Sequence, residues 1–334
     1  MTGRDYGGSM GRVIEGRYGF CVMPSTKMSG HNRHAIFVSV LVARCRVNYL
    51  PQQTNVLITR FMQPTAYRIS CIISTYCDAA YVSKKMEEIE RQTIFDEVEF
   101  IFIETGSPEC ERELIRPYLD KFSNIKLLTT DDRMGLYQAW NMGWNAAQAD
   151  VVCYSNMDDA LHPCCLEYVA NYMEARREKD LCSVMIAYQY ETSKGDRDSF
   201  DSERLRHLKI SRRLGPFTAW RKDVSERLGM FDENFQVMGD LDFWSRAIDS
   251  DVGIGMIYKV LYLYSVAPTQ LSKSKGMETE RRYSAGKGIG LSWLSWKGRL
   301  LLLHRKLFRL FPQPYLLPDS ASCREVGRDQ AGRD

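Results

Sequence analysis

The 334-residue sequence lacks the features that mark several common classes of protein. No apolar stretch reaches the roughly 18–20 residues that a helix needs to span a bilayer. The best apolar run near the N-terminus, residues 35–43, is short and begins too far from Met1 for an ordinary signal peptide. A phosphate-binding loop ending in Gly-Lys-Ser/Thr is also absent, which argues against a P-loop nucleotidase.

The ten cysteines form no Cys-x-x-Cys pair and no cluster with histidine at zinc spacing, which argues against a zinc module. Cys71, Cys153 and Cys182 lie inside apolar runs, where a free cysteine behaves as a small buried hydrophobe. This cysteine usage fits a reducing compartment better than a disulfide framework. We therefore expect a cytoplasmic protein.

The net charge of +3 is too small to indicate a nucleic-acid partner, but its distribution is uneven. Residues 1–66 hold eight Lys/Arg residues against two acids, and residues 281–318 hold eight against none. Residues 1–66 form a basic, poorly defined N-terminal arm. The sequence leaves open a flexible arm, an added strand, a targeting segment, or translation upstream of a start such as Met62.

From Tyr67 onward, short apolar runs alternate with amphipathic segments. The pattern predicts strands over residues 69–75, 98–103, 125–128 and 151–155, with helices over 80–92, 108–122 and 136–148. This alternation is typical of βαβ units with right-handed crossovers. We therefore expect an α/β fold with a Rossmann-like, mostly parallel sheet flanked by helices.

The helical segments carry further signals. Val82, Met86 and Ile89 share one face of the first helix, and its charged residues are expected elsewhere: Lys84, Lys85, Glu87 and Glu88. Ser107 suits the N-cap of the second helix, because Pro follows it at the first helical position. Pro117 is expected to bend or shorten that helix.

A polar cluster follows each of the four predicted strands, and the carboxyl ends of parallel strands meet at one edge of the sheet. The clusters are Thr75, Tyr76 and Asp78, then Glu104 to Ser107, then Asp131 to Arg133 with Gly135, and finally Asn156 to Asp159. A solvated loop or helix cap is the alternative for any one of them. Their convergence favours a functional site.

These groups suit the binding of a nucleotide. The carboxylate of Asp78 or Glu104 can accept from a base N–H or a ribose hydroxyl, and Arg133 can face a diphosphate through its fork of donors. Asp158 can hold a divalent metal that also binds substrate phosphates. The adjacent Asp159 is expected to have a supporting role.

Four segments occur here in a characteristic order: IISTY at 72–76, FIETGS at 102–107, RMGLYQAWNMG at 133–143 and NMDD at 156–159. In order and spacing they resemble family 2 glycosyltransferases, over roughly residues 67–270. The resemblance implies the GT-A fold and transfer of a sugar from a nucleotide-sugar, most often a UDP-sugar, as in polysaccharide biosynthesis. It also implies a glycan, lipid-linked or other hydroxyl acceptor, inversion at the anomeric carbon, and help from Mg²⁺ or Mn²⁺.

By position, the resemblance implies that the nucleotide pocket is lined by Thr75, Tyr76, Asp78 and Glu104, and that Asp158 ligates the metal. Two departures stand out. Asn156 replaces the first Asp of the family's Asp-x-Asp motif and keeps an acceptor for ribose or a metal-bound water. Glu104 replaces an Asp that usually faces the base. Both leave the site possible, but the first weakens the case for a metal.

The segment GDLDFWSR at 239–246 stands where the family has an acid pair at the start of a helix. By position Asp240 is the catalytic base, and Gly239 replaces the preceding Glu. Asp242 competes for this role, or serves the first helical turn or the acceptor. Trp220 is a further candidate for acceptor binding by stacking on a sugar, with core packing as the alternative.

The remaining segments are less informative. A helix is expected over residues 163–177, strands over 182–190 and 254–264, and a mobile polar loop over the site at 193–211. Residues 271–318 are expected to form a basic amphipathic helical extension, and 319–334 a polar tail. Residues 291–311 suit contact with an anionic membrane surface, or packing against the catalytic domain or a second subunit.

Two other functions remain as alternatives to an inverting glycosyltransferase. A nucleotidyltransferase of the same fold would carry a Gly-rich signature with Arg and Lys near the first strand, which is absent. A non-catalytic or degenerate nucleotide-sugar-binding protein is suggested by Asn156 and Gly239. An assay with a panel of nucleotide-sugars separates it from an enzyme.

Overall fold

The computed structural model describes residues 67–191, 193–195, 200, 208–211, 215–267 and 280. All of them belong to one compact unit of the chain. The predicted arm at 1–66, the membrane contact at 291–311 and the tail at 319–334 lie outside the described residues. Within the described residues, no helix has the length and apolar character required of a membrane span.

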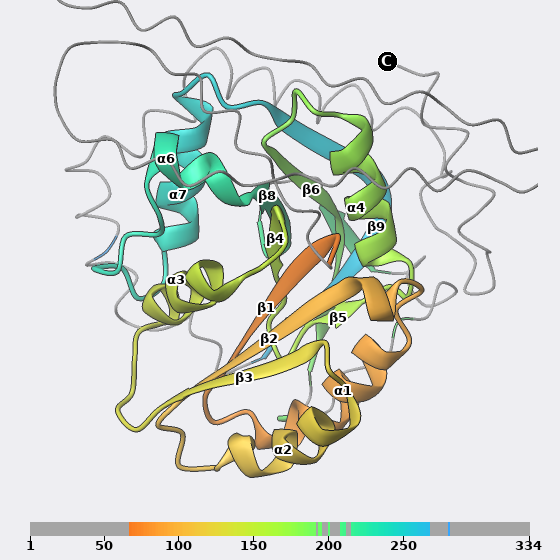
Figure 1. The fold of residues 1–334 in the computed structure, drawn as a ribbon, viewed down its shortest axis with the longest axis vertical. Helices are drawn as coiled ribbons and strands as arrows, with labels where there is room; N and C mark the ends of the chain where they lie inside the picture. Colours follow the sequence, from red (N-terminus) through yellow and green to blue (C-terminus); the bar gives the residue numbers. More distant parts are fainter. Residues whose placement is uncertain are drawn as a thin grey trace, which may run out of the picture. The chain divides into compact units, whose positions relative to one another are not determined.

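The first half of the sheet is the predicted parallel layer. Its strands are β1 (Ile69–Thr75), β2 (Val98–Thr105), β3 (Ile125–Thr130) and β4 (Val151–Tyr154), in the spatial order β3-β2-β1-β4. Each neighbouring pair is parallel, so all four carboxyl ends lie at the same edge (Figure 1). The prediction of an α/β fold with a mostly parallel sheet is confirmed.

The second half of the sheet is mixed in direction. The short strand β8 (Thr218–Arg221) runs antiparallel between β4 and β6 (Leu181–Tyr190), and β6 pairs in parallel with β9 (Ile254–Val266). Two further strands, β5 (Ala160–Leu161) and β7 (Lys209–Ser211), pair with β9 and β6. The sequence did not predict β5, β7 or β8, because strands of two to four residues are too short to show a period.

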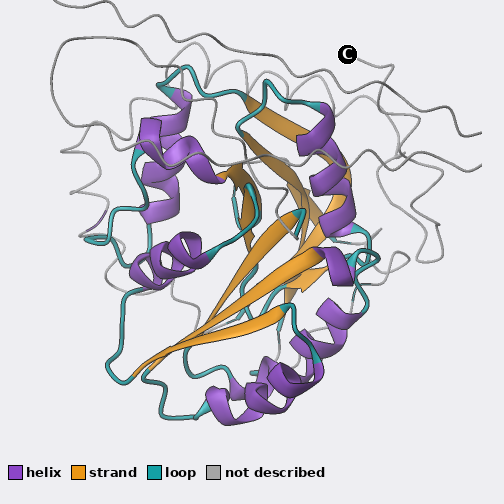
Figure 2. Cartoon of the chain, viewed as in Figure 1, coloured by secondary structure: helices purple, strands orange, loops and turns teal. Residues whose placement is uncertain are grey.

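Helices cover both faces of this sheet (Figure 2). On one face lie α1 (Val82–Glu90), α2 (Glu111–Lys121) and α4 (Cys165–Ala175), and on the other α3 (Leu136–Ala146), α6 (Ser225–Leu228) and α7 (Gly239–Ile248). Short 3₁₀ turns at Ala79–Tyr81, Phe95–Glu97 and Lys222–Val224 complete the connections. The central strands β1, β2 and β4 are therefore buried on both sides.

The strand period of two divides the core into two layers. On β1, Ile69, Cys71 and Ile73 pack with the residues of α1, α2 and α4, whereas Ile72 packs with those of α3 and α7. Cys71, Cys153 and Cys182 are buried and free, as the sequence predicts. Cysteine here serves as a small core side chain.

The start of α2 differs from the prediction. The helix begins at Glu111, after Cys110 in the left-handed conformation with φ of 54°. Ser107 does not cap it. Its hydroxyl accepts instead from the backbone N–H of Cys77 at 3.0 Å, which ties the loop after β2 to the loop after β1. Pro117 lies within the helix without ending it.

Candidate active site

The strand ends bring the predicted site residues to one edge. In the sheet register Thr75 pairs with Glu104, and Glu104 with Thr129 on β3, so the segments that follow β1, β2 and β3 begin side by side. Thr75 is 2% exposed, and its hydroxyl has no hydrogen-bond partner among the described residues. A buried, unpartnered hydroxyl at a ligand-binding edge suits a group that a substrate supplies.

Tyr76 and Arg133 lie in the segments that follow β1 and β3, and the fold brings them together. The Arg133 guanidinium carbon lies 4.2 Å from the centroid of the Tyr76 ring. At this distance the ring face attracts the cation and limits where it points. The predicted diphosphate-binding arginine is thus held over the loop that follows β1.

Asp78 and Asp158 are close enough for their charges to interact. Burial, together with the charges of the Asp158 and Glu111 carboxylates, raises the pKa of Asp78 to about 7. Glu111 also accepts from the backbone N–H of Asp78 at 2.5 Å. Carboxylates held in this way carry repulsion that a bound cation would relieve.

The residues fit a divalent ion that is shared with substrate. No three His, Cys, Asp or Glu side chains cluster closely enough to hold a metal within the described part of the chain. Mg²⁺ bound by one or two carboxylates with substrate phosphates and waters needs no such cluster. Asp158, with Asp78 nearby, stays the predicted ligand of such an ion.

Asp159 supports the loop that carries Asp158. It is fully buried, and its Oδ1 accepts from the backbone N–H of Ser265 at 2.8 Å. Its Oδ2 accepts from the Tyr262 hydroxyl at 2.6 Å and from Asn156 Nδ2 at 2.8 Å. Burial and the charge of Asp158 raise the pKa of Asp159, and these three hydrogen bonds oppose the rise. The network ties the loop after β4 to strand β9.

Asn156 therefore has a structural partner that its motif position does not reveal. Its amide nitrogen donates to Asp159, and its backbone N–H donates to the Tyr262 hydroxyl at 3.3 Å. Its Oδ1 accepts no hydrogen bond from the described residues, so it can face a substrate group or a metal-bound water.

Lys85 is a supporting residue that the sequence reasoning placed wrongly. It is fully buried rather than on the outer face of α1. Its Nζ donates to the backbone oxygen of Asp159 at 2.8 Å and to Ser155 Oγ at 3.2 Å, and pairs with Glu88 at 3.0 Å. The signal was available, because position 85 lies three residues after Val82 and four before Ile89, on the buried face.

Glu104 is held from within the protein. It is fully buried, and its carboxylate accepts from the backbone N–H of Ser107 and from Arg112 Nε at 2.5 Å. Arg112 also donates to the backbone oxygen of Thr130 at 3.1 Å, so it joins the ends of β2 and β3. Sequence reasoning missed Arg112. A base contact by Glu104 stays a prediction, and it would have to share these bonds.

Asp240 lies in the first turn of α7 and is partly buried. Its Oδ1 accepts from the backbone N–H of Leu241 at 2.8 Å and from the Tyr137 hydroxyl at 3.3 Å, whereas no described residue bonds its Oδ2. Burial raises its pKa, and the charge of Glu280 adds to this. The Asp240 charge also raises the pKa of Tyr154, at the end of β4. The predicted base thus lies near the strand end that leads to Asp158.

Glu280 fixes the segment before α7. Its carboxylate accepts from three successive backbone N–H groups, those of Gln236 at 2.5 Å, Val237 at 2.9 Å and Met238 at 2.8 Å. It lies outside the segments that the family resemblance singled out, and no sequence signal marked it.

Two predicted acceptor contacts are corrected by burial. Trp220 is 0% exposed and packs against Trp144 and Phe243 in the core, so its ring offers no face to a sugar. Asp242 is 3% exposed and pairs with Arg246 at 2.8 Å. Arg246 in turn donates to the backbone oxygen of Met230 at 2.8 Å, so this pair holds α7 to the preceding loop.

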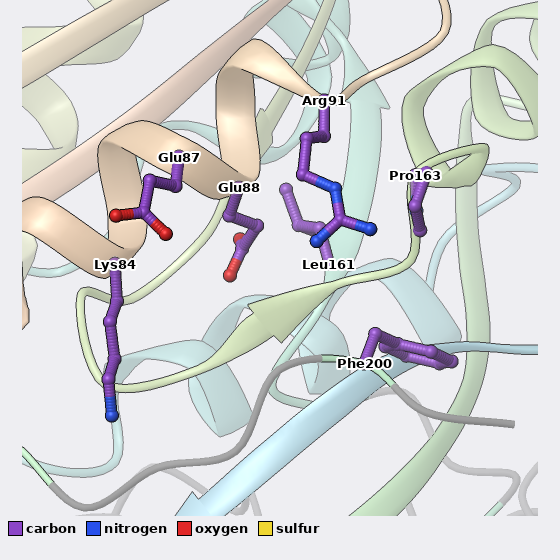
Figure 3. A pocket seen from close by; sticks show the side chains of 7 residues that line it. All are labelled: Lys84, Glu87, Glu88, Arg91, Leu161, Pro163 and Phe200. Atoms are coloured by element: carbon purple, nitrogen blue, oxygen red, sulfur yellow. The ribbon is translucent and has the colours of Figure 1, made fainter. Parts of the chain in front are cut away.

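A small pocket lies elsewhere, beside α1 and β5 (Figure 3). Its lining is formed by Lys84, Glu87, Glu88, Arg91, Leu161, Pro163 and Phe200. None of the predicted site residues contributes to it, so it is separate from the candidate active site.

Solved structures of other proteins share this fold. The solved structure of S. aureus TarS 1–349 in complex with UDP-GlcNAc matches with a TM-score of 0.54 at 17% identity, covering 68% of this chain and 66% of that one. The structure therefore has the GT-A fold. Glycosyltransferase AglE of Haloferax volcanii is 22% identical over 241 residues, covering 70% of this chain and 76% of that protein.

A shorter match reaches higher identity. The cholesterol galactosyltransferase of Borreliella burgdorferi is 30% identical over 122 residues, which is 36% of this chain and 34% of that protein, so the chain spans about a third of its length. The family model described as glycosyl transferase family 2 matches residues 70–229, which include all but the first residue of β1, the Asn156–Asp159 loop and β8. Residues 70–229 thus form a glycosyl transferase family 2 domain, and the chain is a glycosyltransferase.

Proposed function

We propose that the protein transfers a sugar from a UDP-sugar to a hydroxyl of a glycan or lipid-linked acceptor, with inversion, and with Asp240 as the general base. The observation that carries the proposal is the state of Asp240. One carboxylate oxygen is held by Leu241 and Tyr137, and the other has no partner among the described residues. This is the arrangement that a positioned base requires.

The transfer is a direct displacement. Asp240 takes the proton of the acceptor hydroxyl while that oxygen forms a bond to the anomeric carbon. The bond from the anomeric carbon to the diphosphate oxygen breaks on the opposite side, and its electron pair leaves with the diphosphate. Because burial raises the pKa of Asp240, the carboxylate is a stronger proton acceptor than an exposed one.

The donor side is supported by the strand-end residues. The unpartnered hydroxyl of Thr75 can bond the nucleotide, and Arg133, held over Tyr76, can face the diphosphate. Asp158, with Asp78 nearby, would hold Mg²⁺ or Mn²⁺, which supplies a Lewis acid for the diphosphate leaving group. The UDP-GlcNAc complex of TarS is the basis for naming a UDP-sugar.

The test is a panel of labelled nucleotide-sugars, including UDP-sugars and GDP-mannose, in hydrolysis and transfer assays. Asp240→Asn should lower turnover by about two to four orders of magnitude while UDP binding persists. Asp249→Asn, at the exposed end of the same helix, is the control and should be neutral. Near-normal turnover of Asp240→Asn refutes the base. Binding without turnover of any donor supports a non-catalytic protein instead.

A further inference from the structure

Tyr137 joins α3 to the start of α7. Its ring is 1% exposed and packs edge-on against Trp140, with ring centroids 5.3 Å apart. Its hydroxyl reaches the backbone oxygen of Val237 at 2.7 Å and Asp240 Oδ1 at 3.3 Å. A buried aromatic ring with few rotatable bonds holds its hydroxyl at a well-defined position. The position next to the candidate base is therefore set by the core.

Gly239 provides the room for this ring. A Cβ added at residue 239 would lie 2.7 Å from the Tyr137 atoms Cδ2 and Cε2. Contacts this short force one of the two groups to move. The glycine that precedes Asp240 is thus fitted to Tyr137.

We propose that Tyr137 is a positioning residue for Asp240. The Tyr137 hydroxyl holds Oδ1 of Asp240 and leaves Oδ2 of Asp240 directed to the acceptor. The inference rests on the proposed function, since it concerns the same carboxylate.

The single hydroxyl proton of Tyr137 can be donated in either protonation state of Asp240, to a different acceptor in each. When the carboxylate is ionised, its charge attracts the proton, which is then donated to Oδ1. When Asp240 is protonated, the hydroxyl donates to the backbone oxygen of Val237 at 2.7 Å. Among the described residues, the titratable groups that face Asp240 are Tyr137 from α3, Tyr154 from β4 and Glu280.

Tyr137 therefore opposes the other influences on the base. Its hydrogen bond lowers the pKa of Asp240, whereas burial and the charge of Glu280 raise this pKa. Removing the hydroxyl while keeping the ring should leave the core packed and make Asp240 harder to ionise. A raised pKa of Asp240 in a variant that keeps its stability would indicate a positioning role, whereas a purely structural role would leave this pKa unchanged.

The experiment measures kcat/KM against pH for Tyr137→Phe in the full chain. We expect kcat/KM to fall about five- to tenfold near pH 7 and its acid limb to move up by about half to one pH unit, with the donor KM unchanged. Tyr168→Phe is the matched control. It removes another buried hydroxyl, one that has no partner in the described structure, and the pH profile should not move.

Two further variants decide the outcome. In the Asp240→Asn background, adding Tyr137→Phe should change turnover by less than about twofold, because the base that Tyr137 positions is already lost. Gly239→Ala should move the acid limb in the same direction by displacing the ring. An unmoved acid limb in either folded variant overturns the role of Tyr137. Normal turnover of Asp240→Asn alone would instead overturn the proposed function.

Discussion

Restoring the family's usual acid at position 156 should harm the protein. In Asn156→Asp, the donor to Asp159 Oδ2, now 2.8 Å away, is replaced by a second carboxylate. Asp159 is fully buried and already has a raised pKa, partly because of the charge of Asp158. The new charge therefore enters a place where negative charge is already costly.

The size of the effect follows from two contributions. The lost hydrogen bond to a charged group is worth about 1.5–3 kcal/mol. Two carboxylates about 4 Å apart repel by about 4 kcal/mol at an effective dielectric constant of about 20. Uptake of a proton can relieve this repulsion, but at pH 8 it costs about 1.4 kcal/mol for each unit by which the pH exceeds the ordinary carboxyl pKa of about 4, which is about 5–6 kcal/mol. We therefore expect the free energy of unfolding to fall by about 5 kcal/mol at pH 8.

The sign of the pH dependence follows from the raised pKa. A carboxyl whose pKa is higher in the folded than in the unfolded state stabilises the fold when protonated, and this stability is lost as pH rises through the folded pKa. At pH 5 the new carboxyl keeps its proton and can donate it to Asp159 in place of the amide. The loss should then be about 1 kcal/mol or less.

The assay is urea unfolding of the full chain at pH 5 and pH 8, comparing midpoints at equal slope. Asn156→Ala is the matched control, because it removes the same donor without adding a charge and should show a smaller dependence on pH. Equal stability of Asn156→Asp and the natural protein at pH 8 would refute the contact with Asp159 as the reason for asparagine.

Two further changes test other parts of the site. Asp158→Ala should abolish any Mn²⁺ dependence of UDP binding in calorimetry, whereas Asp249→Ala, at the exposed end of α7, should leave it intact. Equal UDP affinity of the natural protein with and without Mn²⁺ would refute the metal. Gly143→Ala should lower stability by about 1–3 kcal/mol in thermal unfolding, because its Cβ would lie 2.7 Å from side-chain atoms of Ile72 and Ile103. If Gly143→Ala were as stable as the natural protein, the prediction would be wrong, because the neighbouring side chains would have moved without loss of stability.

The sequence predicted those elements whose signal is periodic. Strand β1 has the predicted bounds Ile69–Thr75, and the helices α1, α3 and α4 end within a few residues of their predicted positions. Parallel pairing then placed the strand ends at one edge, which is why Tyr76 and Arg133 meet although 57 residues separate them. Local patterns were sufficient because the topology follows from them.

The sequence failed where a residue is defined by a distant partner. The helical spacing of Lys85 indicates the buried face, but its partners, Ser155 and the Asp159 backbone, do not follow from any local pattern. Trp220 reads as a possible sugar platform until β8 is inserted between β4 and β6, which buries it among other aromatic rings. Arg112 and Glu280 belong to no motif: Arg112 bonds Glu104 and the Thr130 backbone, and Glu280 bonds backbone N–H groups.

The two departures from the family motifs illustrate the same point for function. Compared position by position, Asn156 and Gly239 suggested a weakened enzyme, since each stands where an acid is usual. In the structure each is fitted to a neighbour: Asn156 donates to the buried Asp159, and Gly239 makes room for the Tyr137 ring. An acid at 156 would repel Asp159, and a side chain at 239 would displace Tyr137. A motif departure that is matched by its contact partner is therefore weak support for a loss of activity, because the partner and the departure form one arrangement.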